Sequence, residues 1–307
     1  MNLVSVTASA VVKIIIMTAV GFVAAKANIL TKEASDGCTK VLVNVMVPFM
    51  IISSFFRQYD PELLKGMGIS LLLFLVYAAA GVVIGLVAVK KNNPNLEVER
   101  VCLMYQNAGF IGLPIAEMLF GQVGVIYLAV HVACFNLFFF THGIMVYTNR
   151  ITKENFLKSL KSPVIPSIII GLIIFLANIK LPAQISSPIS SVGACATPLG
   201  MMISGGIIAR SDIAATLKNK RAYLICGIKM IVLPLIVLVA AVLFRLEQTV
   251  GVCAVVMAAC PMAAFDVMFA EIHKKNSAYA SGMFGLTTIM CIVTIPLFVM
   301  LYGICIR

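Results

Sequence analysis

Long apolar stretches recur along the whole chain, and this repetition constrains the possible folds more than any other feature. A stretch of about 20 residues can form one helix that crosses a hydrocarbon core of about 30 Å. Charged residues make up only 11% of the sequence, whereas a soluble domain carries roughly 25%. The sequence therefore predicts an all-α polytopic membrane protein.

Ten transmembrane helices are predicted from the apolar runs between charged or turn-rich breaks. They are expected at residues 4–25, 39–56, 66–89, 98–120, 122–147, 163–180, 187–209, 222–244, 248–270 and 277–304. No basic residue precedes the first run and Lys13 interrupts it, so we interpret this run as a span rather than a signal peptide.

The loops between these spans differ strongly in charge. Odd-numbered loops contain sixteen Lys and Arg residues, and even-numbered loops contain four. Because cytoplasmic loops are enriched in basic residues, we expect the odd loops to be cytoplasmic and both termini to be extracytoplasmic. The basic residues of these loops also account for the net charge of +11. The sequence has no basic stripe with interleaved aromatic residues, so no nucleic-acid partner is expected.

The chain also resembles itself at a nearly constant offset. The matching positions are residues 21–29 with 171–179, Pro48 with Pro198, and Pro114 with Pro261, at offsets of 150, 150 and 147 residues. Repeats with an odd number of spans lie in opposite membrane orientations. We therefore predict an inverted repeat, with residues 1–150 as the first five-helix unit and residues 151–307 as the second.

Two of the predicted spans are poor candidates for continuous helices. Span four contains Gly109, Gly112 and Pro114, and span nine contains Pro261. Glycine and proline disfavour helix interiors, so we expect breaks near the two prolines. Interrupted helices in corresponding positions of two halves indicate a substrate site near the midplane. A pair of ordinary proline kinks is the alternative.

A break inside the membrane leaves unpaired N–H groups at a half-helix N-terminus, where the helix dipole favours anions. We therefore expect a carboxylate substrate. The predicted substrate-binding residues are Asn107, Gly109, Gly112, Pro114, Pro261, Asn44 and Asn136. Asn107 is the preferred ligand because its amide can both donate and accept. A hydrogen bond between helices is the alternative role for each of the three asparagines.

Ionisable residues inside spans are functional candidates. Asp266 is expected either to take up a proton during transport or to offset the helix N-terminus after Pro261. Lys229 is expected either to pair with Asp266 or the anion, or to extend to the cytoplasmic interface. The nine cysteines and three histidines show no metal-ligand spacing, so neither a metal nor a cofactor is expected.

Several of these segments carry a family resemblance. Residues 106–114, 161–182, 200–209 and 287–296 resemble the auxin efflux carrier family, whose bacterial transporters are related to the plant PIN carriers. The resemblance extends over nearly the full length. It implies ten helices in five-plus-five inverted repeats, with a scaffold group and an elevator-like transport group. It also implies that broken helices 4 and 9 cross at Pro114 and Pro261.

The resemblance has implications for the substrate as well. Family members move organic anions, namely dicarboxylates such as malate and malonate in bacteria and auxin in plants, and Asn107 matches their substrate-facing asparagine. The short central loop favours a bacterial-type member, in the cytoplasmic membrane. Family members often have Asn, Ser or Thr after the second proline, whereas residues 262–265 here read Met-Ala-Ala-Phe. We therefore expect specificity to come mainly from the first half.

Together these features predict a secondary transporter for a small organic anion such as malate, malonate or another carboxylate, working by alternating access. A membrane channel or sensor for organic anions is the alternative, although we find no filter sequence and no soluble output domain. The sequence contains neither a phosphate-binding loop nor a catalytic constellation, so no enzymatic activity is expected. Proton coupling and homodimer formation are left open.

Overall fold

The structure is a computed structural model that describes residues 3–148, 157, 162–211 and 213–306. The four basic residues of the predicted long connection near 148–162 lie outside the described residues; they are Arg150, Lys153, Lys158 and Lys161. Within the described residues the fold is all-α, apart from one isolated backbone bridge.

The first half of the chain forms α1 (Leu3–Lys26), α2 (Lys32–Val41), η1 (Leu42–Met46), α3 (Val47–Ser54), α4 (Pro61–Ala88), α5 (Leu96–Met104), η2 (Ala108–Gly112), α6 (Leu113–Phe138), η3 (Phe139–Gly143) and α7 (Ile144–Thr148), where η denotes a π-helical turn. The second half forms α9 (Val164–Leu176), α10 (Ala183–Ala194), α11 (Ala196–Arg210), α12 (Ile213–Leu217), α13 (Lys220–Gly227), η4 (Ile228–Val232), α14 (Leu233–Leu243), α15 (Gln248–Ala258), α16 (Ala264–Ile272) and α17 (Ser277–Cys305).

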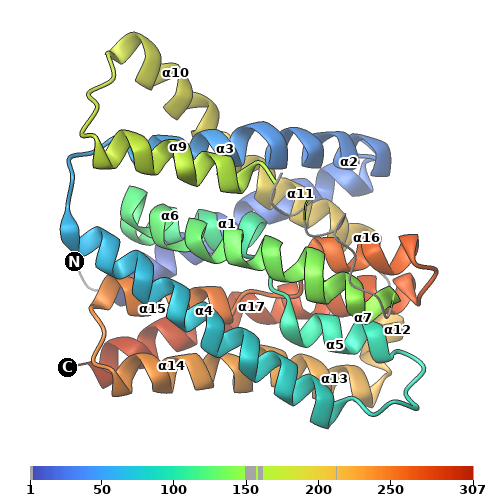
Figure 1. Ribbon diagram of the computed structural model, residues 1–307. Helices are drawn as coiled ribbons and strands as arrows, with labels where there is room; N and C mark the ends of the chain where they lie inside the picture. Colours follow the sequence, from blue (N-terminus) through green and yellow to red (C-terminus); the bar gives the residue numbers. More distant parts are fainter. Residues whose placement is uncertain (1–2, 149–156, 158–161, 212, 307) are drawn as a thin grey trace.

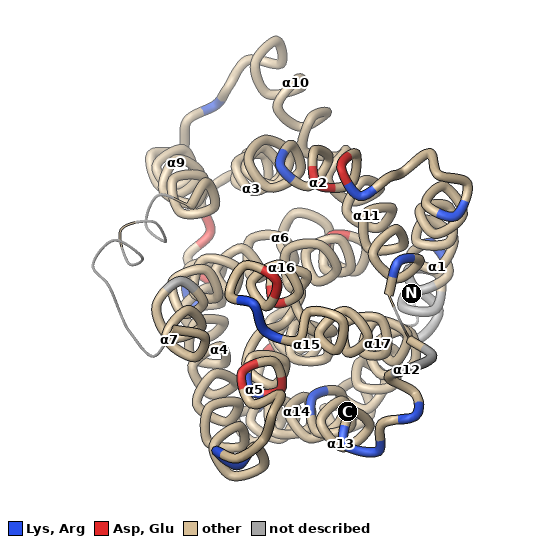
Figure 2. Tube along the Cα trace, turned by 90° about the vertical axis from the view of Figure 1, so that its right-hand side faces the viewer, with Lys and Arg blue, Asp and Glu red and all other residues tan. Residues whose placement is uncertain are grey.

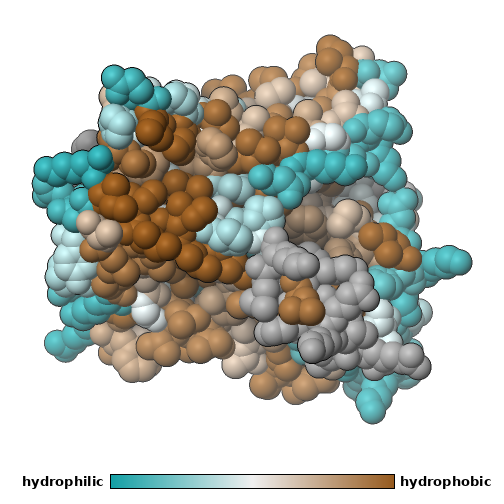
Figure 3. Space-filling model, turned by 45° about the horizontal axis from the view of Figure 1, so that its top comes forward, coloured by the Kyte–Doolittle hydropathy of each residue, from teal (hydrophilic) through white to brown (hydrophobic). Residues whose placement is uncertain are grey.

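Six helical stretches of the described chain are long and apolar enough to cross a membrane. They are Lys32–Ser54, Pro61–Ala88, Ala108–Thr148, Ala183–Arg210, Lys220–Leu243 and Ser277–Cys305. The stretch over Ala108–Thr148 is interrupted at Gly121, whose φ of 59° turns the chain between predicted spans four and five. Figure 3 shows hydrophilic residues gathered at two ends and largely hydrophobic surface between them, as expected of a multi-pass membrane protein.

The helices form two layers that pack on each other (Figures 1 and 2). The scaffold layer consists of α1 to α3 with η1 and α9 to α11; in it α1 packs along α11, and α3 packs on α9 and α10. The crossover layer consists of α4 to α7 and α13 to α17 with their π turns; in it α4 contacts α6 and α14, and α15 contacts α6 and α17. Buried side chains of both layers, such as Ile51 and Leu128, belong to one hydrophobic cluster.

The described odd-numbered loops meet at one end of the molecule, on the right of Figure 1, which we call the basic end. There the Arg210 guanidinium donates to the carbonyl oxygen of Leu30 over 2.9 Å, and the Asn276 amide donates to Asn95 over 3.0 Å. Both chain termini lie at the opposite end, which we call the termini end (Figure 1).

Three of the four π-helical turns in the described residues precede a proline by two positions. The turns η1, η2 and η4 precede Pro48, Pro114 and Pro234. In each case the N–H of the residue before the proline bonds to the carbonyl five residues back. The wider turn accommodates a ring that has no N–H to donate, so these prolines remain inside helices.

This accommodation corrects the expected position of the break in span four. The chain leaves the helix at residues 105–107, between α5 and η2, whereas Pro114 lies in the first turn of α6. The prediction of a break near Pro114 is therefore wrong in position, because the π turn η2 lets the helix continue through this proline. The break in span nine covers residues 259–263 and contains Pro261, as predicted.

The helices α1 and α9, whose sequences recur at an offset of 150 residues, end in the same way. Asn28 and Asn178 follow them with positive φ angles of 60° and 51°. The N–H groups of Ile29 and Ile179 then each bond to the carbonyl five residues back, both over 2.9 Å. Asparagine tolerates this left-handed conformation at helix C-termini, so the repeated Ala-Asn-Ile sequence produces a repeated helix end.

A glycine in each of these two helices permits a close approach to the other half of the chain. A Cβ atom on Gly21 of α1 would overlap the backbone of Met202 in α11. A Cβ atom on Gly171 of α9 would overlap the ring of Phe55, which caps α3. The first helix of each half therefore packs through a glycine on the second span of the other half.

Candidate functional site

The two interrupted helices cross, and their backbones are bonded to each other at the crossing. The N–H of Asn107 donates to the carbonyl oxygen of Pro261 over 2.8 Å, and Gln106 and Met262 form an isolated antiparallel bridge. The N–H of Met262 also donates to the Thr287 hydroxyl on α17 over 3.2 Å. Extended backbone inside a membrane requires hydrogen-bond partners. Each break therefore supplies partners for some of the backbone groups of the other break.

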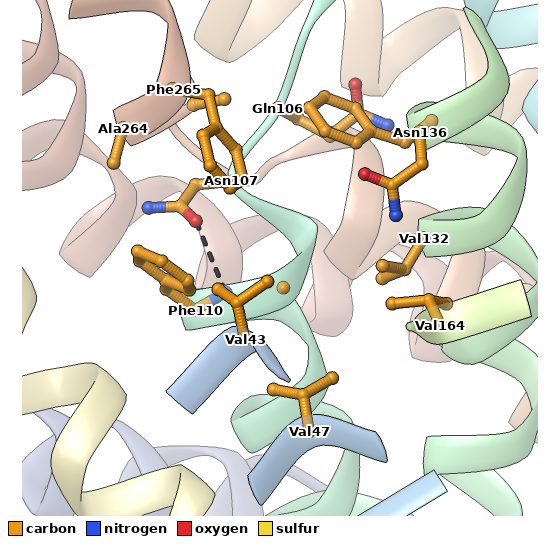
Figure 4. Close-up of a pocket in the computed structure, with 13 residues that line it drawn as sticks. Val43, Val47, Gln106, Asn107, Phe110, Val132, Asn136, Val164, Ala264 and Phe265 are labelled. Atoms are coloured by element: carbon orange, nitrogen blue, oxygen red, sulfur yellow. Dashed lines mark hydrogen bonds between the residues drawn. The ribbon is translucent and has the colours of Figure 1, made fainter. Parts of the chain in front are cut away.

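Asn107 is the N-cap residue of the half-helix that follows the first break. Its Oδ1 accepts the N–H of Phe110 over 3.2 Å (Figure 4). The residue is only 5% exposed, and among the described residues its Nδ2 has no hydrogen-bond partner. An unsatisfied buried donor costs about 1–3 kcal/mol, so a ligand that accepts from Nδ2 would bind favourably.

Three backbone N–H groups accompany this amide. They belong to Gly109 in the first turn of η2 and to Ala264 and Phe265 in the first turn of α16, and none donates to an acceptor within the described chain. All three residues line the same pocket as Asn107. Two half-helix N-termini, which carry the positive ends of the helix dipoles, therefore lie at the wall of this pocket.

The pocket lies between the two layers (Figure 4), and its unfilled space is about 460 Å³ when the gaps between atoms and the open solvent at its mouth are counted. The crossover layer contributes Gln106, Asn107, Gly109, Phe110, Val132, Phe135, Asn136, Ala263, Ala264 and Phe265, and the scaffold layer contributes Val43, Val47 and Val164. No charged side chain of the described residues lines it. Its walls are apolar apart from three amide side chains and the free N–H groups.

Of the seven predicted binding residues, three line the pocket, namely Asn107, Gly109 and Asn136. Asn136 lies on α6, across the pocket from Asn107 (Figure 4). Asn44 lies instead on the exposed surface, where its amide donates to the carbonyl oxygen of Lys40 over 2.8 Å. Its amide is thus satisfied within its own helix.

The other three predicted residues shape the crossing and are not among the pocket-lining residues. A Cβ atom on Gly112 would lie 3.0 Å from the Leu128 side chain and 3.2 Å from the Cys260 sulfur, so this glycine lets the two broken helices approach. Pro114 lies in the first turn of α6, and Pro261 supplies the carbonyl oxygen that accepts the N–H of Asn107. A direct binding role for these three residues stays a prediction.

Sequence reasoning missed Gln106 and the aromatic pair of the pocket. Gln106 is almost fully buried; its Nε2 donates to the Met257 sulfur and its Oε1 has no partner among the described residues. The rings of Phe110 and Phe265, from η2 and α16, lie 6.2 Å apart between centroids. A polar residue next to Asn107 in an apolar span was the available signal for Gln106.

Asp266 and Lys229 are both fully buried in the crossover layer. Neither carboxylate oxygen of Asp266 has a hydrogen-bond partner in the described part of the chain. Lys229 donates to the Tyr77 hydroxyl and lies over its ring, 5.0 Å from the centroid. Lys229 does not extend to the interface, so that expectation is wrong. Two ionisable side chains are thus buried in the same layer, which is costly in an apolar environment and marks them as functional candidates.

A pocket enclosed by two helix layers, beside two broken helices that cross inside a multi-pass membrane fold, is the arrangement of a membrane transport protein. The sequence profile of a family described as membrane transport protein matches residues 6–151 and 145–299. The chain belongs to this family, the auxin efflux carrier family, and is a transporter rather than an enzyme. No curated protein matches the sequence. The predicted family and the predicted transport class are confirmed.

Proposed function

We propose that this protein is a secondary carrier for a small organic anion, such as malate, malonate or another carboxylate, which binds where the broken helices cross. One observation carries the proposal: Asn107, Gly109, Ala264 and Phe265 line one pocket, and within the described chain the Nδ2 of Asn107 and the backbone N–H groups of the other three have no acceptor. Such donors at two helix N-termini favour a carboxylate without any basic side chain.

The remaining walls distinguish between candidate anions. Away from the donors a ligand meets the apolar side chains of Val43, Val132, Phe135 and Val164, and the neutral amide of Asn136. A second carboxylate against these side chains would lose hydration without compensation. The four apolar side chains therefore favour one carboxylate with an apolar remainder over two carboxylates, and of these five residues the Asn136 amide alone provides a hydrogen-bonding side chain for a second polar group.

Alternating access follows from the position of the pocket between the layers. Because Val47 belongs to the scaffold layer and Asn107 to the crossover layer, relative movement of the layers would open the pocket first to one end and then to the other. The proposed organisation is ten transmembrane helices in two inverted five-helix repeats, residues 1–150 and 151–307. The matching Asn28 and Asn178 helix ends and the reciprocal glycine contacts support this repeat.

The proposed topology places the basic end in the cytoplasm and both termini outside the cell membrane. The gathering of the described odd-numbered loops at one end supports it. For coupling, we propose that Asp266, with Lys229, takes up and releases a proton during transport. The burial of a carboxylate with no hydrogen-bond partner in the described chain supports this role.

Uptake into proteoliposomes tests the proposal. Purified protein should accumulate labelled malate, malonate or butyrate with saturation. Stimulation of this uptake by unlabelled anion loaded inside the vesicles separates a carrier from a channel. Butyrate matches the others approximately in size but carries one carboxylate, and the apolar walls lead us to expect the highest affinity for it. The Asn107→Ala variant should lose uptake at least about tenfold, since hydrogen bonds to charged groups contribute about 1.5–3 kcal/mol.

The matched control is Asn92→Ala, which removes an exposed loop amide and should leave uptake unchanged. A thermal-shift measurement with each acid shows whether a variant still folds and binds, because a ligand of the folded state raises apparent stability. Saturable uptake by Asn107→Ala at the parent rate would remove the proposed site.

A further inference from the structure

Three side-chain polar contacts join the scaffold and crossover layers among the described residues. One links two neutral, half-buried hydroxyls, from Ser281 on α17 to Ser211 at the end of α11 over 3.1 Å. The other two are made by glutamates of the broken helices. The Thr197 hydroxyl on α11 donates to the Glu117 carboxylate on α6 over 2.6 Å. The Lys32 ammonium at the start of α2 lies 3.2 Å from Oε1 and 3.4 Å from Oε2 of the Glu271 carboxylate, near the end of α16. We call these the termini-end contact and the basic-end contact.

The two contacts occupy opposite ends of the pocket. Glu117 lies four residues before the turn at Gly121, on the half-helix that leaves the crossing toward the termini end. Glu271 lies on the half-helix that leaves the crossing toward the basic end, two residues before the loop that begins at His273. Each contact therefore joins the layers on one side of the pocket.

The two contacts resemble each other in the elements that they join. Glu117 follows the bridged residue Gln106 by 11 positions, and Glu271 follows the bridged Met262 by nine. Glu117 binds the second span of the second half, and Glu271 binds the second span of the first half. Each broken helix therefore carries a carboxylate that contacts the second span of the other half, although the offset of 147 residues pairs Glu117 with Ala264 and not with Glu271.

The environments of the two contacts differ. The O–H···O distance of 2.6 Å at Glu117 is in the range of a charge-assisted hydrogen bond, and Thr197 is buried while Glu117 is partly buried. The side chains of Lys32 and Glu271 are 59% and 60% exposed, where water and salt weaken an ion pair. The termini-end contact should therefore be the stronger of the two.

We propose that Glu117 and Glu271 are gate residues of this carrier, which hold the two layers together at the termini end and the basic end of the pocket and release in alternation. The inference rests on the proposed function, because gates on both sides of one site have a purpose only in an alternating carrier. The stronger termini-end contact makes the carrier rest closed on that side and open more often at the basic end.

Labelling of a pocket cysteine from each side of the membrane tests this inference. In a cysteine-free background, Val43→Cys places a thiol of no larger size on the half-buried scaffold wall of the pocket. A membrane-impermeant maleimide is applied to vesicles of either orientation, without substrate. Thr197→Val removes the hydroxyl donor at nearly constant shape, and Lys32→Met removes the cation and retains the apolar stem.

Thr197→Val should raise the labelling rate from the termini side about tenfold or more, as expected for the loss of a hydrogen bond to a charged group. Lys32→Met should raise labelling from the basic side by at most about fivefold, as expected for an exposed ion pair. Thr197→Ser retains the donor and should label like the parent. Exchanging the charges, Lys32→Glu with Glu271→Lys, should restore the parent rate.

Matched controls come from contacts inside one helix. Thr39→Val removes a hydroxyl that bonds to Ser35 within α2, and Lys65→Met breaks the pair with Glu62 within α4; neither should change labelling. Parent-like labelling of Thr197→Val and Lys32→Met from both sides, or an increase from the same side in both, overturns the gate assignment.

Uptake by the parent protein keeps the two proposals distinct. Saturable uptake with unshifted labelling would overturn the gates alone. If the two variants shift the labelling as expected but the parent protein transports none of the tested anions, the gate assignment stands and the proposed function is contradicted.

Discussion

The backbone N–H of Asn107 donates to the carbonyl oxygen of Pro261 over 2.8 Å, and these two residues belong to different halves of the chain. The bond exists because both helices are interrupted at the same depth, so that two short extended segments pair. The side chain of Asn107 meanwhile caps the half-helix that follows it. Both halves of the chain therefore fix the position of its free amide nitrogen.

The first prediction concerns Thr287, whose hydroxyl accepts the N–H of Met262 at the second break. Thr287→Val should lower the free energy of unfolding by about 1–3 kcal/mol, because it leaves a buried N–H without an acceptor. Thermal unfolding in detergent measures the loss. Thr288→Val is the control, since the Thr288 hydroxyl bonds to Phe284 within its own helix. Equal destabilisation by the two variants would contradict a special role of Thr287.

A second prediction separates the two glycines of η2. A Cβ atom on Gly109 meets no atom within 4 Å, so Gly109→Ala should fold like the parent and bind the anion more weakly by narrowing the pocket. Gly112→Ala instead crowds Leu128 and Cys260 and should destabilise the fold by about 1–3 kcal/mol. Parallel measurements of the melting temperature and the KM of uptake check both expectations. A destabilised Gly109→Ala protein, together with a Gly112→Ala protein as stable as the parent, would contradict the described pocket geometry.

The third prediction addresses coupling through Asp266. Asn has nearly the same shape as Asp and cannot bind a proton, so Asp266→Asn should make uptake independent of pH. The comparison is a series of initial uptake rates between about pH 5 and pH 8, the range in which biological proton gradients act. Glu62→Gln, which alters an exposed carboxylate, serves as the control. A pH profile of Asp266→Asn identical to that of the parent removes Asp266 from coupling.

A fourth prediction tests the contact between α1 and α11. Gly21→Ala forces a methyl group into the backbone of Met202 and should cost about 1–3 kcal/mol of stability. Gly68→Ala on α4 meets no atom within 4 Å and should be neutral or slightly stabilising, because alanine favours helix over glycine. Thermal unfolding of both variants decides the matter. A Gly21→Ala protein as stable as Gly68→Ala would show that the two helices are not held this closely.

The positions of the helices could be predicted from hydropathy, and the ends of α1 and α9 from the repeated Ala-Asn-Ile sequence. The position of the first break could not. Residues 105–107 read Tyr-Gln-Asn and contain no helix breaker. They are extended because Gln106 pairs with Met262 and Asn107 bonds to Pro261, and such long-range pairing is invisible in a local sequence window.

The candidate site was likewise predictable only in part. Asn107 and Asn136 could be chosen because amides are rare in apolar spans, and both line the pocket. The same reasoning selected Asn44, whose amide is satisfied by the Lys40 carbonyl one turn away. Short polar side chains often bond to nearby backbone, and composition alone does not reveal which face of a helix they occupy.

The pocket walls are contributed by both helix layers, and this has a pharmacological consequence. Because Val43 and Val164 come from one layer and Asn107 and Phe265 from the other, the pocket keeps its shape only while the layers hold one relative position. A carboxylate with a rigid apolar extension, long enough to contact both layers at once, would act as a wedge. Such a compound would compete with the substrate, arrest the protein in a single conformation and inhibit transport without itself being carried.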